Sequence, residues 1–100
     1  MRTIKLSIKA SRKLDELLKF LEIEWSQKVK QDFILKLDNS FNTICEFPES
    51  CQKTDFVKGL HKLVATKQTS VFYRFDSQKI YVVAIFDNRM NPKKLKKKVK

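Results

Sequence analysis

The fold is decided near the end of the chain, where residues 79–95 have the sequence KIYVVAIFDNRMNPKKL. The apolar run in this segment, residues 80–86, stops abruptly at the polar turn formers of residues 87–92. A run of this length, rich in β-branched and aromatic residues, predicts a central strand that is buried on both faces. Arg89 follows the end of that strand, where a rigid sheet holds a guanidinium in a fixed place.

Two more strands are predicted just before this segment. Gly59, the only glycine, introduces an apolar stretch at residues 60–65, and a third strand is expected over residues 69–75. Residues 76–78 leave room only for a tight turn between the third strand and the long one. These two strands must therefore be antiparallel.

The beginning of the chain predicts a strand followed by a helix. Residues 2–9 alternate between apolar and polar side chains, with Ile4, Leu6 and Ile8 on one face, as in a half-exposed strand. Ser11 is then the expected N-cap of a helix. Its buried stripe consists of leucines at helical spacing, namely Leu14, Leu17, Leu18 and Leu21.

A second, longer helix is expected after Ser26, which is a good N-cap, and Pro48 ends it. Residues 22–25 lie between the two helices without a Gly or Pro to force a break. A continuous helix of about 35 residues would be long for so small a domain, so a helical hairpin is favoured. Trp25 and Phe47 are expected to fill the core beneath the hairpin. The apolar face of the second helix comprises Val29, Phe33, Leu37, Phe41 and Ile44.

These elements predict an α+β domain with the order β-α-α-β-β-β. Two amphipathic helices can cover one face of a sheet, which gives a two-layer domain with an antiparallel-rich four-stranded sheet under a helical hairpin. The expected organisation is a single domain over residues 1–92, followed by a lysine-rich C-terminal tail at residues 93–100.

The charge of the chain is unevenly placed. The formal net charge is +11, and six lysines without any acid lie in residues 93–100, so residues 1–92 carry +5. Such a balance favours contact with nucleic acid or with an acidic protein. No apolar run approaches the ~20 residues of a membrane helix, and no leader-like segment precedes a cleavage site. A cytoplasmic protein without membrane contact is therefore expected.

Residue types argue against a cofactor, a metal site or the common kinds of small-molecule enzymology. The chain has one histidine and one glycine, so it cannot build an ordinary glycine-rich phosphate loop or a paired histidine site. Cys45 and Cys51 lack a second cysteine pair or suitably spaced histidines, which excludes the usual zinc motifs. A reduced pair is favoured over a disulfide. No cofactor and no metal are expected.

The last three predicted strands carry a resemblance to a known family. The segments GLHKLV (59–64), VFYRF (71–75) and IYVVAIFDNRMNPKKL (80–95), together with the β-α-α-β-β-β order, resemble the RelE/ParE superfamily of toxins from type II toxin–antitoxin systems. In the ParE-like branch an aspartate, an arginine, an asparagine and a proline commonly follow the final strand, as Asp87, Arg89, Asn91 and Pro92 do here. The resemblance implies a growth-arresting toxin that a cognate antitoxin neutralises.

Two activities are implied by that superfamily. RelE-like toxins cut messenger RNA in the ribosomal A site, whereas ParE-like toxins poison DNA gyrase and cut nothing themselves. The nuclease uses basic residues on the second and third strands, an arginine after the fourth strand and often a C-terminal tyrosine. Here Ser70 falls where the third-strand arginine would be, and no tyrosine follows Pro92. The ParE-like reading is favoured, and whether the protein is an enzyme stays open.

The alternatives are a RelE-like ribosome-dependent endonuclease and a non-toxic basic module that binds nucleic acid or protein. If the protein is a nuclease, the candidate catalytic residues are His61, Lys62 and Arg89. Strand alternation sends His61 and Lys62 to opposite faces, so at least one of them is expected to be merely solvated. The candidates for binding the target or the antitoxin are Lys62, Tyr73, Arg74, Arg89, Lys93 and Lys94.

Each of two arginines has a second interpretation. Arg74 could instead pair with Asp76 or Glu46 at the edge of the sheet, and Arg89 could anchor the tail. Because Arg89 is expected outside the core, its replacement by alanine should leave the fold intact and lower toxicity. The expected partner is an antitoxin with an acidic, amphipathic segment that wraps the sheet, in a hetero-oligomer. Its carboxylates would occupy the space that Arg89 and Lys62 otherwise offer to DNA gyrase or to the ribosome and its mRNA.

Overall fold

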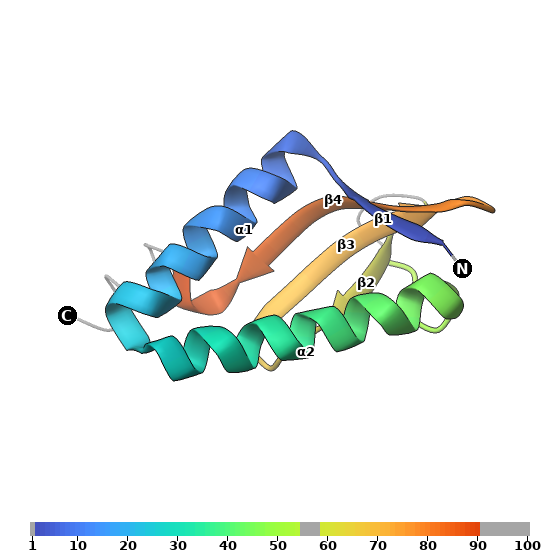
Figure 1. Ribbon diagram of the computed structural model, residues 1–100. Helices are drawn as coiled ribbons and strands as arrows, with labels where there is room; N and C mark the ends of the chain where they lie inside the picture. The colour runs from blue at the N-terminus through green and yellow to red at the C-terminus, as the bar shows by residue number, and fades with distance from the viewer. Residues whose placement is uncertain (1, 55–58, 91–100) are drawn as a thin grey trace.

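The predicted order of elements is confirmed by a computed structural model, which describes residues 2–54 and 59–90 (Figure 1). Two helices lie on one side of a four-stranded sheet. The elements are β1 (Thr3–Leu6), α1 (Ile8–Phe20), a π-helical turn (Leu21–Trp25), α2 (Gln27–Glu46), β2 (His61–Val64), β3 (Thr69–Phe75), β4 (Lys79–Asp87) and a 3-10 turn (Asn88–Met90).

The sheet has the strand order β1-β4-β3-β2. β4 pairs with β3, and β3 with β2, in antiparallel fashion, whereas β1 lies parallel to β4 on its other side. The chain between β1 and β4 includes both helices, β2 and β3, so it is long enough to connect parallel neighbours. The predicted α+β class is therefore confirmed, with one parallel pair in an otherwise antiparallel sheet.

The helical hairpin is also confirmed. Ser26 has extended backbone angles, φ −168° and ψ 166°, which interrupt the helix. Its hydroxyl accepts a hydrogen bond from the amide of Val29 at 3.1 Å, so it caps α2 as predicted. Across the turn, Lys30 and Glu22 form an ion pair of 2.9 Å. The extended backbone conformation of Ser26 thus ends one helix and starts the next, although no Gly or Pro lies between them.

The first helix begins earlier than the sequence predicted. Ser7, and not Ser11, is the N-cap, because the Ser7 hydroxyl accepts from the amide of Ala10 at 2.9 Å. The same hydroxyl donates to the carbonyl of Val83 at 3.0 Å. Ile8 was expected on the apolar face of a strand, but it lies in the first turn of α1 and is 79% exposed. Alternation alone could not distinguish this helix start from one more strand residue.

The prediction that β4 is buried on both faces is wrong. Ile80, Val82 and Ile85 are buried toward the helices, but Phe86 on the other face is 45% exposed. The reason is that both helices cover the same side of the sheet, which leaves the second side open. A bulge interrupts the alternation, because Phe72 and Tyr73 of β3 pair with Ala84 and Val82 and leave Val83 unpaired.

The core lies between the helices and the covered face of the sheet. It includes Leu17, Leu21, Phe33, Leu37, Ile44, Val71, Tyr73, Ile80, Val82 and Ile85. Trp25 and Phe47 were expected there, but they are 56% and 62% exposed, respectively. Each lies where a helix ends, Trp25 in the hairpin turn and Phe47 just after α2, so neither points between the layers.

Cys45 is a buried free thiol, and burial raises its pKa; Cys51 is a half-buried free thiol. Within residues 2–54 and 59–90, no helix has the length and apolar character needed to cross a membrane.

Candidate functional site

The open face of the sheet carries a groove of about 1040 Å³. Its floor consists of two rows of side chains that the strand register brings side by side. Val64 of β2 pairs with Ser70 of β3, which pairs with Phe86 of β4. The next row is Lys62, Phe72 and Ala84. The floor is therefore mainly apolar, and its side chains lie on the face of the sheet opposite to the core.

Charged side chains line the groove on both sides of this floor. One side is α1, with Lys9, Arg12, Lys13 and Glu16, and Ile8 adds an apolar contact at its start. Lys62 and Lys67 also line it, so within residues 2–54 and 59–90 five cations and one carboxylate give the groove lining a formal net charge of +4. This combination of apolar floor and cationic walls suits an acidic amphipathic chain.

The contribution of α1 was missed by sequence reasoning. Lys9, Arg12 and Lys13 are three and four residues apart, which places them on one face of a helix. That spacing was the available signal, but it did not show which surface the basic face adjoins. The bonds from Ser7 to β4 hold the start of α1 beside the open face, so the basic face of this helix adjoins the groove.

His61 and Lys62 lie on opposite faces of β2, as alternation required. Lys62 is exposed in the groove, whereas His61 is only 6% exposed. The His61 Nδ1 lies 2.8 Å from the carbonyl oxygen of Cys51, and its ring stacks on Tyr73 at 5.4 Å between centroids. His61 therefore belongs to the core and to the loop that follows α2.

Tyr73 is likewise a core residue and not part of an accessible surface. Its side chain is fully buried, and its hydroxyl donates to the carbonyl of Pro48 at 2.7 Å. Burial above all, with a contribution from Cys51, raises the pKa of Tyr73. Tyr73 and His61 together fasten the loop after α2 to the sheet.

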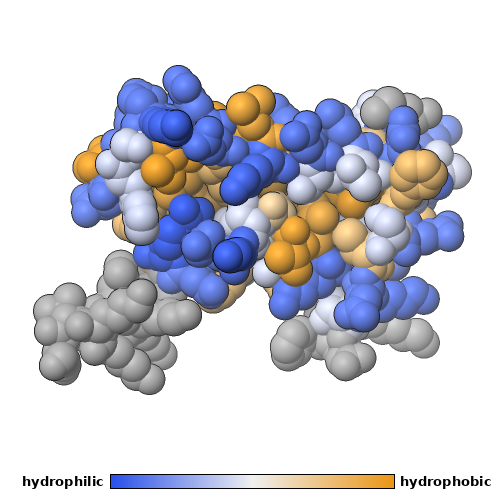
Figure 2. Space-filling view, turned by 90° about the horizontal axis from the view of Figure 1, so that it is seen from below, coloured by the Kyte–Doolittle hydropathy of each residue, from blue (hydrophilic) through white to orange (hydrophobic). Residues whose placement is uncertain are grey.

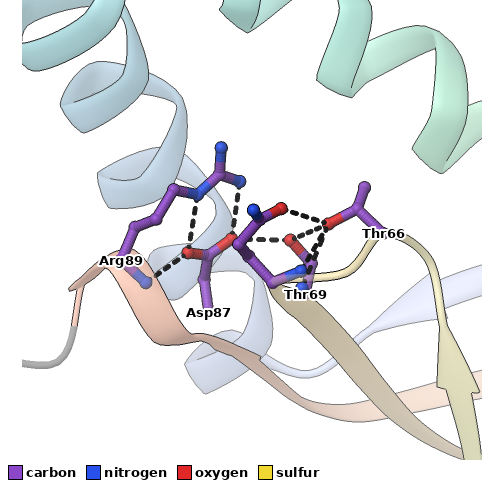
Figure 3. A network of polar contacts seen from close by, with 5 residues as sticks. Thr66, Thr69, Asp87 and Arg89 are labelled. Atoms are coloured by element: carbon purple, nitrogen blue, oxygen red, sulfur yellow. Dashed lines mark hydrogen bonds and ion pairs between the residues drawn. The ribbon is translucent and has the colours of Figure 1, made fainter.

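Arg89 lies where the sequence placed it, after β4, but its guanidinium is already engaged (Figure 3). It donates from Nε to Oδ1 of Asp87 at 3.0 Å and from Nη2 to Oδ2 at 2.8 Å. The fully buried Asp87 also accepts from the hydroxyl of Thr69 at 2.6 Å. Burial acts to raise the pKa of Asp87, but the bonds from Arg89 and Thr69 outweigh it and leave the pKa below its ordinary value.

Arg89 and Lys62 are not brought together. Arg89 borders a separate small cleft of about 200 Å³ between α2 and the β2–β3 turn, whereas Lys62 lines the large groove. The guanidinium carbon of Arg89 also lies 5.9 Å from the ring centroid of Trp25. The shared site that the sequence suggested for these two cations is therefore not assembled.

The remaining candidates are on or beyond the open face. Arg74 is exposed and pairs in the ladder with Tyr81; in the part of the chain that the structure describes, it forms no ion pair with Asp76 or Glu46. Asp76 instead accepts from the amides of Gln78 and Lys79 in the turn before β4. Lys93 and Lys94 lie outside the described residues.

A second, smaller pocket, of about 520 Å³, lies among Arg2 and the described residues that follow α2. Figure 2 shows the side that α2 lines, where hydrophobic residues form separate patches among hydrophilic ones. In residues 2–54 and 59–90 no cluster of three or more His, Cys, Asp or Glu could hold a metal ion. The groove is thus the candidate binding site.

Comparison with known proteins agrees with this architecture. The family model described as the ParE toxin of the type II toxin–antitoxin system, parDE, matches residues 4–92. A solved structure from the chromosomal ParDE TA system of P. aeruginosa superimposes with a TM-score of 0.71 and 15% identity, covering 87% of this chain and 96% of that one. That likeness shows the fold. No curated protein matches the sequence.

Proposed function

Because this chain belongs to the ParE toxin family of type II toxin–antitoxin systems, we propose that it arrests growth by poisoning DNA gyrase and that a cognate antitoxin neutralises it. The protein would act in the cytoplasm, as part of a hetero-oligomer with that antitoxin. The groove supports the proposal beyond the family, because its apolar floor and cationic walls suit a docking partner and, among the described residues, His61, Lys62 and Arg89 lie in three different places.

The groove supports an antitoxin as the partner. An amphipathic segment lays its apolar face into an apolar groove, and here Phe72 and Phe86 form the floor. Acidic residues along the edges of that segment would meet the cations of α1 and Lys62. Coupled folding of such a segment typically buries ~1,000–3,000 Å². An antitoxin bound there would cover the open face of the sheet.

The placement of the basic residues supports a non-nucleolytic toxin over a RelE-like endonuclease. RNA cleavage needs groups that converge on one phosphate to activate the 2′-hydroxyl, stabilise the developing charge and protonate the leaving oxygen. His61 is in the core, Lys62 is in the groove, and Arg89 is bound to Asp87 beside another cleft. Ser70, and not an arginine, lies on the groove floor between Val64 and Phe86.

The test is induction of the full-length chain, with two readouts taken from the same culture. We expect growth arrest and linearised plasmid DNA trapped with gyrase, without new transcript 5′ ends. New 5′ ends between codon positions, with intact plasmid, would instead identify a RelE-like nuclease. Unimpaired growth would favour the non-toxic basic binding module.

A further inference from the structure

We infer that Glu16 makes the groove select an antitoxin segment whose charge changes along its length, acidic over most of one edge and cationic near one end. This inference rests on the proposed function, because it assumes that the groove binds the antitoxin. It adds a specificity-determining residue to that surface. Among the described residues that line the groove, Glu16 is the one carboxylate.

The direction of α1 fixes where Glu16 lies along the groove. Ser7 donates from its amide to the carbonyl of Val82 at 2.9 Å and from its hydroxyl to Val83, so α1 starts beside the middle of β4. From there α1 runs along β4 toward the end of that strand (Figure 1). Glu16 follows Lys9 by seven residues, about 10 Å along the helix axis.

The cations are not spread evenly over that length. Lys62 shares its row with Phe72 and Ala84, at the end of the groove where α1 begins with Lys9. Arg12 and Lys13 follow on the same helix, before Glu16.

Lys67 lies beyond the row of Val64 and Phe86, at the end where Asn88 donates to the carbonyl of Gln68. Lys9 and Lys62 therefore lie at one end of the groove, Arg12 and Lys13 lie midway along it, and Lys67 and Glu16, whose charges cancel, lie at the other end.

Glu16 is available to a partner. Its side chain is exposed on α1, and among the described residues it forms no ion pair, although Arg12 is one helical turn away. Glu22 by contrast is occupied by Lys30. A uniformly acidic segment would place a carboxylate against Glu16, whereas a segment with a lysine there would gain an ion pair. Such a repulsive contact is how an interface rejects a related but wrong partner.

Two synthetic helical peptides test this inference with the full-length protein. Both carry the same apolar face; the first has glutamate at every position along its charged edge, and the second has lysine in place of glutamate over the last turn. Because a helix can enter in either direction, the lysines are free to reach Glu16. The measurement is the ratio of the two dissociation constants for wild-type protein, for Glu16→Lys and for Glu24→Lys. Glu24→Lys is the matched control, since Glu24 is an exposed acid in the hairpin turn that does not line the groove.

We expect Glu16→Lys to shift the ratio toward the all-glutamate peptide by roughly two- to fivefold or more, as for exposed charge pairs, and Glu24→Lys to leave the ratio unchanged. An equal shift in both variants would show a net-charge effect and overturn the role of Glu16. An unchanged ratio in Glu16→Lys would also overturn it while leaving the docking surface intact. If neither peptide binds wild-type protein, the docking surface itself is wrong, whatever the induction experiment shows about toxicity.

Discussion

Arg89 and Asp87 form a two-bonded ion pair, with Nε–Oδ1 and Nη2–Oδ2 distances of 3.0 and 2.8 Å, directly after the central strand. The pair closes the end of β4 against Thr69 at the start of β3, and it places the guanidinium beside Trp25 of the hairpin turn. Arg89, which the sequence suggested as a residue that binds the target or the antitoxin, therefore connects the sheet to the hairpin turn.

Replacement of Arg89 by alanine should destabilise the protein. The variant leaves the carboxylate of Asp87 buried with only Thr69 as a side-chain partner, and removing one member of a buried pair costs about 3 kcal/mol. Urea unfolding of wild type, Arg89→Ala and Arg89→Lys measures this. Arg89→Lys keeps the charge but loses the two-bonded geometry, so it should fall between the others. Unchanged stability of Arg89→Ala would restore the surface role that the sequence suggested.

The same ion pair predicts how stability depends on pH. The pKa of Asp87 is lower in the folded protein than in the unfolded chain. Its contribution is therefore fully present above the ordinary carboxyl pKa, near 4, and is lost as the pH falls through the folded value. We expect the free energy of unfolding to drop below about pH 4 in wild type and to drop less in Asp87→Asn. A steeper acid loss in that variant would contradict the assignment.

The N-cap of α1 can be tested with two neighbouring serines. Ser7→Ala removes the hydroxyl that caps the helix, and we expect a loss of about 1 kcal/mol in the free energy of unfolding. Ser11→Ala is the matched control, because Ser11 is an exposed residue within the helix, and it should change stability by a few tenths of a kcal/mol at most. The reverse order of the two losses would favour a helix that starts at Ser11.

Charge reversal in the groove should weaken antitoxin binding. Lys62→Glu places a carboxylate beside Phe72 on the open face, and we expect about a fivefold loss of affinity at low salt that shrinks as salt is raised. The antitoxin would be the protein encoded beside this chain, titrated in solution. Lys28→Glu, an exposed lysine of α2 outside the groove, carries the same charge change and should have little effect. Equal losses in both variants would mean that the groove is not the docking site.

Much of the fold could be predicted because its signals are local. Apolar stripes at helical spacing predicted the two helices. The excessive length of a continuous helix predicted the hairpin, with Ser26 as the second cap, and the short connection through residues 76–78 predicted the antiparallel pairing of β3 and β4. The start of the first helix was wrong because two local signals compete there. Ser7 and Ser11 are both acceptable cap residues; Ser7 caps the helix through the amide of Ala10, and its tertiary bond to the carbonyl of Val83 could not be read from the sequence.

The candidate site was harder to predict because it depends on tertiary placement. The basic face of α1 becomes part of the groove only when that helix lies beside the open face of the sheet. Arg89 is two residues from Asp87, so the sequence allows this pairing but did not predict it. The sequence did not show that Asp87 is buried opposite Thr69. A buried carboxylate needs a cationic partner, and Arg89 is that partner.

The unpaired Val83 determines which face of the sheet each later side chain of β4 points to. With strict alternation after Val82, Phe86 would turn inward under the helices and Asp87 would turn out toward the groove. An outward carboxylate would neutralise part of the basic groove and release Arg89 from the hairpin. One extra residue in a strand thus separates an acid that holds the fold together from the cations that are left to receive a partner.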